Sequence, residues 1–267
     1  MAVDFLFKDK YNINDLIEIV RILRAPGGCP WDIKQTHASI KKDFIEETYE
    51  VVEAINKDDK TLLCEELGDV LLQVAFHSDI ERENGTFDFD DVADGICKKL
   101  IIRHPHVFGD VKADTADEVL SNWDEIKRRT KRQKSVAESI DSIPRELPAL
   151  MRASKIQSRA AKTGFDFDST DGAFDKITEE AAELKEAIAS GDKAKISDEL
   201  GDLLFAAVNV ARFTGVEAEE SLTASSDKFS SRFKITEELA KQRNIDMKSA
   251  SIEELDVLWD EAKKLTK

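Results

Sequence analysis

Two short groups of acidic residues have the spacing of paired metal ligands. In the first group, E-E-x-x-E covers residues 46–50 and E-x-x-D covers 66–69, and the same two patterns recur at 179–183 and 199–202. Residues three apart on a helix lie on one face, so each pattern directs two carboxylates the same way. Carboxylate oxygens suit Mg²⁺ and Mn²⁺, whereas zinc and copper favour nitrogen and sulfur ligands. The acidic groups therefore predict two sites for hard divalent cations.

A short polar break separates the two halves of each group, at residues 57–60 and 190–193. Such a break between amphipathic stretches predicts an antiparallel helical hairpin. At about 1.5 Å per residue along a helix, the two halves then reach the same level, and four carboxylates repel one another unless a cation neutralises them. The predicted metal ligands are Glu47, Glu50, Glu66 and Asp69 in the first copy and Glu180, Glu183, Glu199 and Asp202 in the second.

The two groups belong to an internal repeat. Shifting the chain by 133 residues superposes residues 46–72 on 179–205 without a gap, and 13 of these 27 positions are identical. Two copies of one helical unit are the simplest description of this pattern. We predict an N-terminal unit over residues 1–140 and a C-terminal unit over residues 141–267. Downstream, Lys99, Arg103, Trp123 and Lys127 of the first copy correspond to Lys228, Arg232, Trp259 and Lys263 of the second.

An ordinary interpretation of the acids is a solvated helix face, because glutamate favours exposed helix surfaces. The repeat at identical spacing argues against it, and so do the neighbouring apolar residues, which predict a packed interface beside the acids. Gly68 and Gly201 add to this argument, since a glycine within a helix costs about 1 kcal/mol relative to alanine and indicates close approach of another helix. Di-iron bundle proteins are excluded because they need Glu-x-x-His, which neither copy has. The apolar residues beside the acids are Val51, Ile55, Leu67, Leu184, Ile188 and Leu200.

Composition sets the class of protein. Among 267 residues, 41% are hydrophobic and 35% charged, which is apolar enough to bury a core and too polar to span a bilayer. The net charge of −16 argues against nucleic acid and anionic membranes as partners. Apolar residues recur at helical spacing and strand signals are nearly absent, so we predict an all-α fold. Three cysteines without C-x-x-C spacing and the lack of signal-peptide features predict a cytoplasmic protein.

These residues resemble the MazG family of nucleoside triphosphate pyrophosphohydrolases, whose signature is E-E-x-x-E followed by E-x-x-D. Residues 27–40, 103–108, 143–161 and 164–167 are also similar to stretches of its two-module members. The resemblance implies an all-α pyrophosphatase fold, with four-helix-bundle units formed with a dimer partner. It also implies hydrolysis of nucleoside triphosphates to monophosphate and pyrophosphate with Mg²⁺, for which Mn²⁺ can substitute.

The resemblance implies roles for residues of the second copy as well. Glu179, beside the metal ligands, is the candidate for the group that activates water, and it joins Glu180, Glu183, Glu199 and Asp202 as the catalytic set. Basic side chains offset phosphate charge and tryptophan offers a face on which a base can stack. The implied substrate-binding residues are Lys176, Glu179, Lys195, Asp198, Lys228, Arg232, Trp259 and Lys263.

The first copy keeps its four metal ligands but has Asp43 and Leu62 at the positions of Lys176 and Lys195. Because two cations for phosphate are missing, we predict that the second copy is the main catalytic site and that the first is weaker, differently selective or vestigial. Trp31, His37, His104 and His106 of the first copy are interpreted as packing or solvated residues. The alternatives are a narrower dUTP, dCTP or phosphoribosyl-ATP pyrophosphohydrolase and a non-catalytic, metal-loaded, nucleotide-binding helical scaffold.

Overall fold

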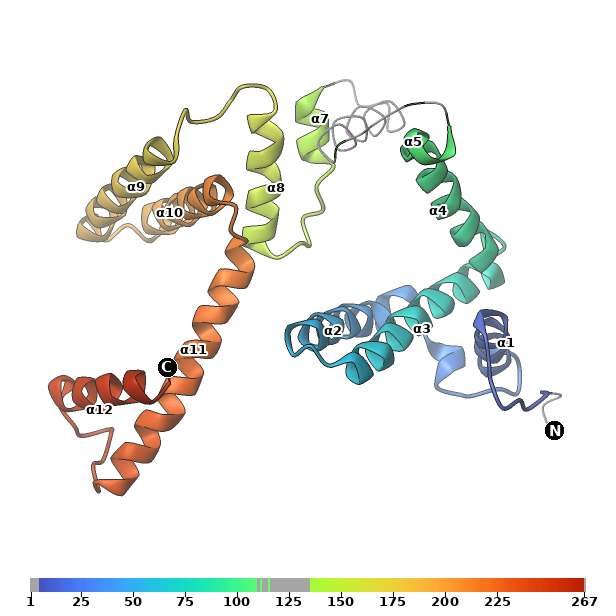
Figure 1. The fold of residues 1–267 in the computed structure, drawn as a ribbon, viewed down its shortest axis with the longest axis horizontal. Coiled ribbons are helices and arrows are strands. Elements are labelled where there is room, and N and C mark those ends of the chain that lie inside the picture. The colour runs from blue at the N-terminus through green and yellow to red at the C-terminus, as the bar shows by residue number, and fades with distance from the viewer. Residues whose placement is uncertain (1–4, 110, 112–114, 116–134, 267) are drawn as a thin grey trace. The chain divides into compact units, whose positions relative to one another are not determined.

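The structure is a computed structural model that describes residues 5–109, 111, 115 and 135–266. Within these ranges the chain forms eleven α-helices and one 3-10 helix and has no strand, so the all-α prediction is confirmed (Figure 1). No helix in the described ranges is long and apolar enough to cross a membrane. The chain divides into two compact units, Met1–Thr130 and Lys131–Lys267. The predicted boundary after residue 140 lies inside helix α7 (Val136–Asp141).

The first unit is built around an antiparallel hairpin of two long helices, α2 and α3. Helix α1 packs on α3, and α4 contacts both α3 and α5. The elements of this unit are α1 (Ile13–Arg24), η1 (Asp32–Lys34), α2 (His37–Asn56), α3 (Lys60–Asn84), α4 (Phe89–Arg103) and α5 (Pro105–Phe108).

The second unit repeats the hairpin with α9 and α10, which pack along each other. Helix α8 lies against α10 and α7 against α8, while α11 runs from α8 and α10 to α12 (Figure 1). The further elements of this unit are α8 (Ala149–Ala161), α9 (Thr170–Ser190), α10 (Lys193–Thr214), α11 (Ala218–Gln242) and α12 (Ile252–Leu265).

Equivalent capping residues begin the helices of both hairpins. Thr36 and Ser169, which are 133 residues apart, cap α2 and α9 by accepting a hydrogen bond from a backbone N–H. Asp59 and Asp192 do the same for α3 and α10, each through two backbone N–H groups. Such caps satisfy donors that have no partner within the helix. The polar breaks in the sequence are therefore the turns of the hairpins, as predicted.

The apolar faces beside the acids are exposed within the chain. Ile55, Leu67, Ile188 and Leu200 are each between 46 and 59% exposed. A Cβ added at Gly68 or Gly201 would meet no atom within 4 Å. Val51 and Leu184 beside them are half-buried. Within the described residues of one chain nothing covers the exposed part of these faces, so the packed interface and the close helix expected here stay predictions.

Candidate functional site

The second hairpin brings three of the predicted metal ligands together. Glu180 on α9 and Glu199 and Asp202 on α10 each offer a carboxylate oxygen, and these oxygens all lie within 4.8 Å of one another. Burial raises the pKa of Glu199, and the charges of Glu183 and Glu180 raise it further. Glu183 is therefore close enough to act on the cluster electrostatically, although it is not one of the three residues that converge.

Lys176 neutralises part of this cluster. Its Nζ lies 2.8 Å from an oxygen of Glu179, three residues further along α9, and 2.6 Å from Oε1 of Glu180, four residues further along. Hydrogen bonds to both carboxylates raise the pKa of Lys176, so its ammonium stays protonated. The Oε2 atom of Glu180 is buried and has no hydrogen-bond partner in the described structure. One oxygen of this buried carboxylate is thus held by Lys176, and the other is left for a ligand.

The first hairpin repeats the cluster with Glu47, Glu66 and Asp69. Burial and then the charge of Asp69 raise the pKa of Glu47. Burial followed by a hydrogen bond with Glu50 raises the pKa of Glu66. Both pKa shifts have the direction expected of carboxylates that are held close together without a neutralising cation.

Both clusters fit a hard divalent cation. Their donors are all carboxylate oxygens at a spacing that one ion can bridge, and the unpartnered buried oxygen of Glu180 is an acceptor that a cation would satisfy. Such ions take oxygen ligands, and a buried charge needs a counter-charge. Glu180, Glu199 and Asp202 would hold the ion in the second unit, and Glu47, Glu66 and Asp69 in the first.

A cavity of about 630 Å³ opens beside the second cluster. Lys176, Glu180 and Asp202 line one part of it, and a mixture of aromatic, apolar and polar side chains lines the rest. Four consecutive segments form it, namely α8, the loop that follows α8, and helices α9 and α10. The other lining residues are Ile156, Gln157, Ala160, Gly164, Phe165, Asp166, Phe167, Ala173, Phe205, Ala206, Asn209 and Arg212. Sequence reasoning noted the stretches 143–161 and 164–167 as similar to the family but did not assign these residues to a cavity, because neither periodicity nor motif spacing connects them.

The remaining predicted nucleotide contacts do not line this cavity. Lys195 and Asp198 are exposed on the first turns of α10.

The predicted contacts on α11 and α12 lie among residues of these two helices. Arg232 on α11 donates to the Thr266 hydroxyl at 3.2 Å. Trp259 on α12 packs on Phe229, with ring centroids 5.1 Å apart. Lys228 is also exposed on α11, and Lys263 on α12 pairs with Asp260. Their roles in nucleotide binding stay predictions, while Trp123 and Lys127 lie outside the described residues.

The histidines of the first unit do not gather with its carboxylate cluster. His37 Nδ1 lies 2.6 Å from His77 Nδ1, and His37 Nε2 lies 2.6 Å from Glu81. Burial and the neighbouring His37 lower the pKa of His77. These contacts agree with the interpretation of His37 as a residue whose ring nitrogens are paired with neighbouring side chains. Trp31 was expected to pack against other residues, but it is exposed.

Fold and clusters together define an all-α protein with two helical units, each carrying a carboxylate site suited to a divalent cation. The profile of the MazG nucleotide pyrophosphohydrolase domain matches residues 35–108 and 168–236, so it matches once in each unit. The chain belongs to the MazG family, which is a family of hydrolases.

Similar proteins cover nearly the whole chain. It is 43% identical over 257 residues to a nucleoside triphosphate pyrophosphohydrolase of Escherichia coli K12, covering 94% of this chain and 97% of that protein. It is 44% identical over 249 residues to the nucleoside triphosphate pyrophosphohydrolase/pyrophosphatase MazG of Thermotoga maritima, covering 93% and 94%. An uncharacterized protein of Bacillus subtilis, YabN, is 47% identical over 248 residues, which are 92% of this chain and 50% of YabN.

Proposed function

We propose that the protein hydrolyses nucleoside triphosphates between the α and β phosphates, with Mg²⁺, to a nucleoside monophosphate and pyrophosphate. The observation that carries the proposal is the cavity of the second unit, because the same 630 Å³ space is lined by carboxylates of the metal cluster and by aromatic side chains. Such a space suits a ligand with a charged and an apolar end. The names of the relatives from E. coli and T. maritima support the same activity.

When bound by Glu180, Glu183, Glu199 and Asp202, Mg²⁺ supplies positive charge to phosphate oxygens and makes water more acidic. Glu179 accepts the proton of the attacking water. The oxygen of this water forms a bond to the α-phosphorus while the bond to the bridging oxygen breaks, and pyrophosphate leaves with the electron pair. Lys228, Arg232 and Lys263 neutralise the charge that grows on pyrophosphate. Lys176 and Lys195 hold the triphosphate in register, Asp198 orients the groups around it, and Trp259, supplied by a second copy of the chain, stacks on the base.

The first test is product analysis. We expect ATP incubated with the protein and Mg²⁺ to yield AMP and pyrophosphate, and chelation of the metal to stop the reaction. Other nucleoside triphosphates in the same assay will show whether the activity is broad or restricted to dUTP, dCTP or phosphoribosyl-ATP. Formation of ADP and phosphate would contradict cleavage at the α–β bond, and no product at all would favour the scaffold alternative.

We also propose that the protein is a cytoplasmic homodimer in which a second copy covers the exposed faces of the hairpins. The support for this is the exposed apolar surface beside the acids, together with the open space at Gly68 and Gly201. A second copy also offers its own α11 and α12, which carry the basic residues and the tryptophan that do not line the cavity within one chain.

Two aspartates placed on these faces should break the dimer. We expect the double change Leu67→Asp and Leu200→Asp to halve the mass measured by light scattering, because a buried unpaired charge is costly at an apolar interface. The matched control changes Lys60 and Lys193 at the hairpin turns to Asp, which adds the same residues away from the faces and should leave the dimer intact. A wild-type monomer, or a double variant that remains dimeric, would refute the proposed interface.

A further inference from the structure

The cavity of the second unit contains a buried glutamine with one unpaired atom. Gln157 on α8 is 7% exposed, and its Nε2 donates to the backbone carbonyl of Phe205 on α10 at 2.7 Å. A carbonyl can only accept, so the group facing it must be the NH₂, and this fixes the orientation of the amide. The Oε1 atom of Gln157 is buried without a hydrogen-bond partner in the described structure. An unpaired buried acceptor costs stability, which is offset if a ligand donates to it.

A second amide in the cavity is oriented in the opposite sense. Asn209 on α10 accepts hydrogen bonds through Oδ1 from Arg212, from Nε at 2.9 Å and from Nη2 at 2.8 Å. Since the oxygen is occupied, its NH₂ is the group that remains to donate. The cavity therefore offers an oriented acceptor from α8 and an oriented donor from α10. The polar edges of nucleobases present N–H donors beside nitrogen or oxygen acceptors, which matches this pair.

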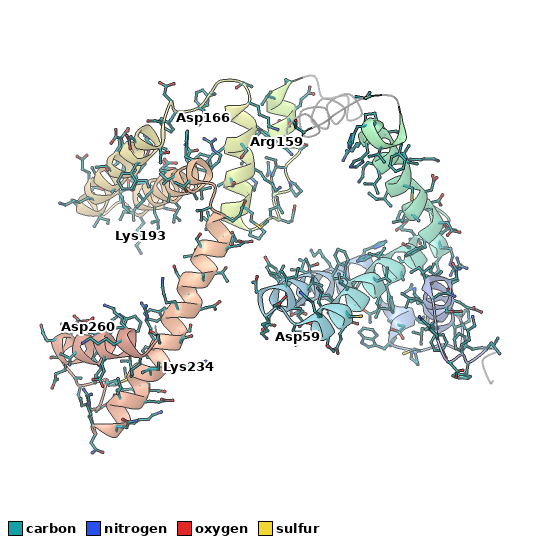
Figure 2. The ribbon with its side chains drawn as sticks, viewed as in Figure 1. Asp59, Arg159, Asp166, Lys193, Lys234 and Asp260 are labelled. Atoms are coloured by element: carbon teal, nitrogen blue, oxygen red, sulfur yellow. The ribbon has the colours of Figure 1, made fainter. Side chains whose placement is uncertain are left out.

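The walls around these amides suit a flat ring. Phe165 lines the cavity and is 82% exposed, and Phe167 and Phe205 line it as well. Arg212 pairs with Asp166, which lies in the loop between α8 and α9 (Figure 2), so the loop that carries both Phe165 and Phe167 is fastened to α10. Aromatic faces stack on any base.

We infer that this part of the cavity holds the base of the nucleotide and that Gln157 Oε1 accepts a hydrogen bond from an N–H group of that base. The inference rests on the proposed function, because the carboxylates at the other end of the cavity are assigned to the triphosphate. Gln157 thus makes the second unit favour bases that carry an N–H donor over bases that lack one.

The first unit carries different side chains at the equivalent positions. The shift of 133 residues places Arg24 at the position of Gln157 and Phe76 at that of Asn209. Arg24 is buried and donates to the carbonyl of Asp32 at 2.8 Å and to Glu83 at 2.8 Å. Phe76 packs in the core cluster with Ile40, which stands at the position of Ala173. The first unit therefore keeps the carboxylates but places a buried arginine, which pairs with Glu83, and larger apolar side chains where the second has its amides.

The test compares two nucleotides that differ in one donor. Purine riboside triphosphate is ATP without the 6-amino group, so its base has no N–H. We expect the wild-type protein to have a kcat/KM about tenfold higher for ATP, because the buried acceptor is left unpaired by the analogue. Gln157→Met, which keeps the size of the side chain, should bring the ratio to about 1 by losing turnover of ATP while turnover of the analogue is retained. Retained turnover of the analogue also shows that the variant is folded.

The matched control is Gln73→Met in the first unit. Gln73 is also a buried glutamine, 8% exposed, with an unpartnered Oε1, and we expect its replacement to leave the ATP-to-analogue ratio at the wild-type value. Equal loss of both substrates in Gln157→Met would show a structural role and overturn the inference.

The inference and the proposed function can fail separately. Turnover of both nucleotides by the wild-type protein with a ratio near 1 overturns the role of Gln157 and leaves the proposed function standing. Turnover of neither refutes the proposed function. The ratio of the two dissociation constants, measured by calorimetry with Ca²⁺ in place of Mg²⁺, then decides the role of Gln157 without turnover: a preference for ATP that Gln157→Met abolishes supports it, and equal affinities overturn it.

Discussion

Asp202→Asn should lower the rate of pyrophosphate release by about 10³-fold or more while leaving the helices intact. Asp202 is one of three carboxylates whose oxygens lie within 4.8 Å of one another, and it also lines the cavity. The amide keeps the size of the side chain but removes the negative charge, and stabilisation of charge in the reaction depends on such groups. The measurement is kcat with saturating Mg²⁺, with circular dichroism to show that the fold is retained. Glu183→Ala should have a similar effect.

The first unit supplies a matched control for each change. Asp69 occupies the equivalent position in a cluster of the same composition, but Asp43 replaces the lysine that pairs with Glu180. We therefore expect Asp69→Asn and Glu50→Ala to retain most of the activity. Equal losses from both units would overturn the ranking of the two sites, and a folded Asp202→Asn protein with a near-normal rate would remove this cluster from the reaction.

The hairpins could be predicted from sequence because their causes are local. Helical periodicity, a polar break and a capping aspartate all lie within a few residues of each turn, and Asp59 and Asp192 cap the helices that follow the breaks. The rise per residue gives the distance of each carboxylate from the turn of the hairpin. These distances are similar on the two helices, which agrees with the convergence of Glu180, Glu199 and Asp202 in the structure.

The cavity could not be predicted in this way because its parts are far apart in the chain. Gln157 contacts the backbone of Phe205, 48 residues away, and a repeat compared only over residues 46–72 and 179–205 does not reach α8. The signal that was present in the sequence is the substitution between the copies. Arg24 stands opposite Gln157 and Phe76 opposite Asn209, which are unusual exchanges within a repeat that keeps its acids.

The glycines illustrate a different limit of sequence reasoning. A glycine within a helix indicates that something approaches closely, but the pattern does not say whether that element belongs to the same chain. Gly68 and Gly201 face open space within the described chain, and the apolar residues beside them are exposed. We therefore expect a second copy of the chain to supply the element that packs against these glycines, which is the basis of the proposed dimer.

Glu199→Gln should have opposite effects on activity and on stability. We expect turnover to fall by about 10³-fold, because a ligand of the proposed metal loses its charge. Burial and the charges of Glu183 and Glu180 raise the pKa of Glu199, which means that the fold disfavours its ionised form. A neutral glutamine removes this repulsion, so the melting temperature measured in the presence of a chelator should rise above that of the wild-type protein.

The difference in melting temperature should reverse when Mg²⁺ is added. A cation that binds the folded state stabilises it in proportion to its affinity, so Mg²⁺ should raise the melting temperature of the wild-type protein more than that of Glu199→Gln. A control is Glu186→Gln on α9, an exposed acid outside the cluster, for which neither activity nor the response to Mg²⁺ should change. If Glu199→Gln were inactive but less stable in chelator, the residue would support the fold rather than hold a cation against repulsion. The repeated acids would then be explained by packing, since their conservation between the two hairpins would no longer require a shared ion.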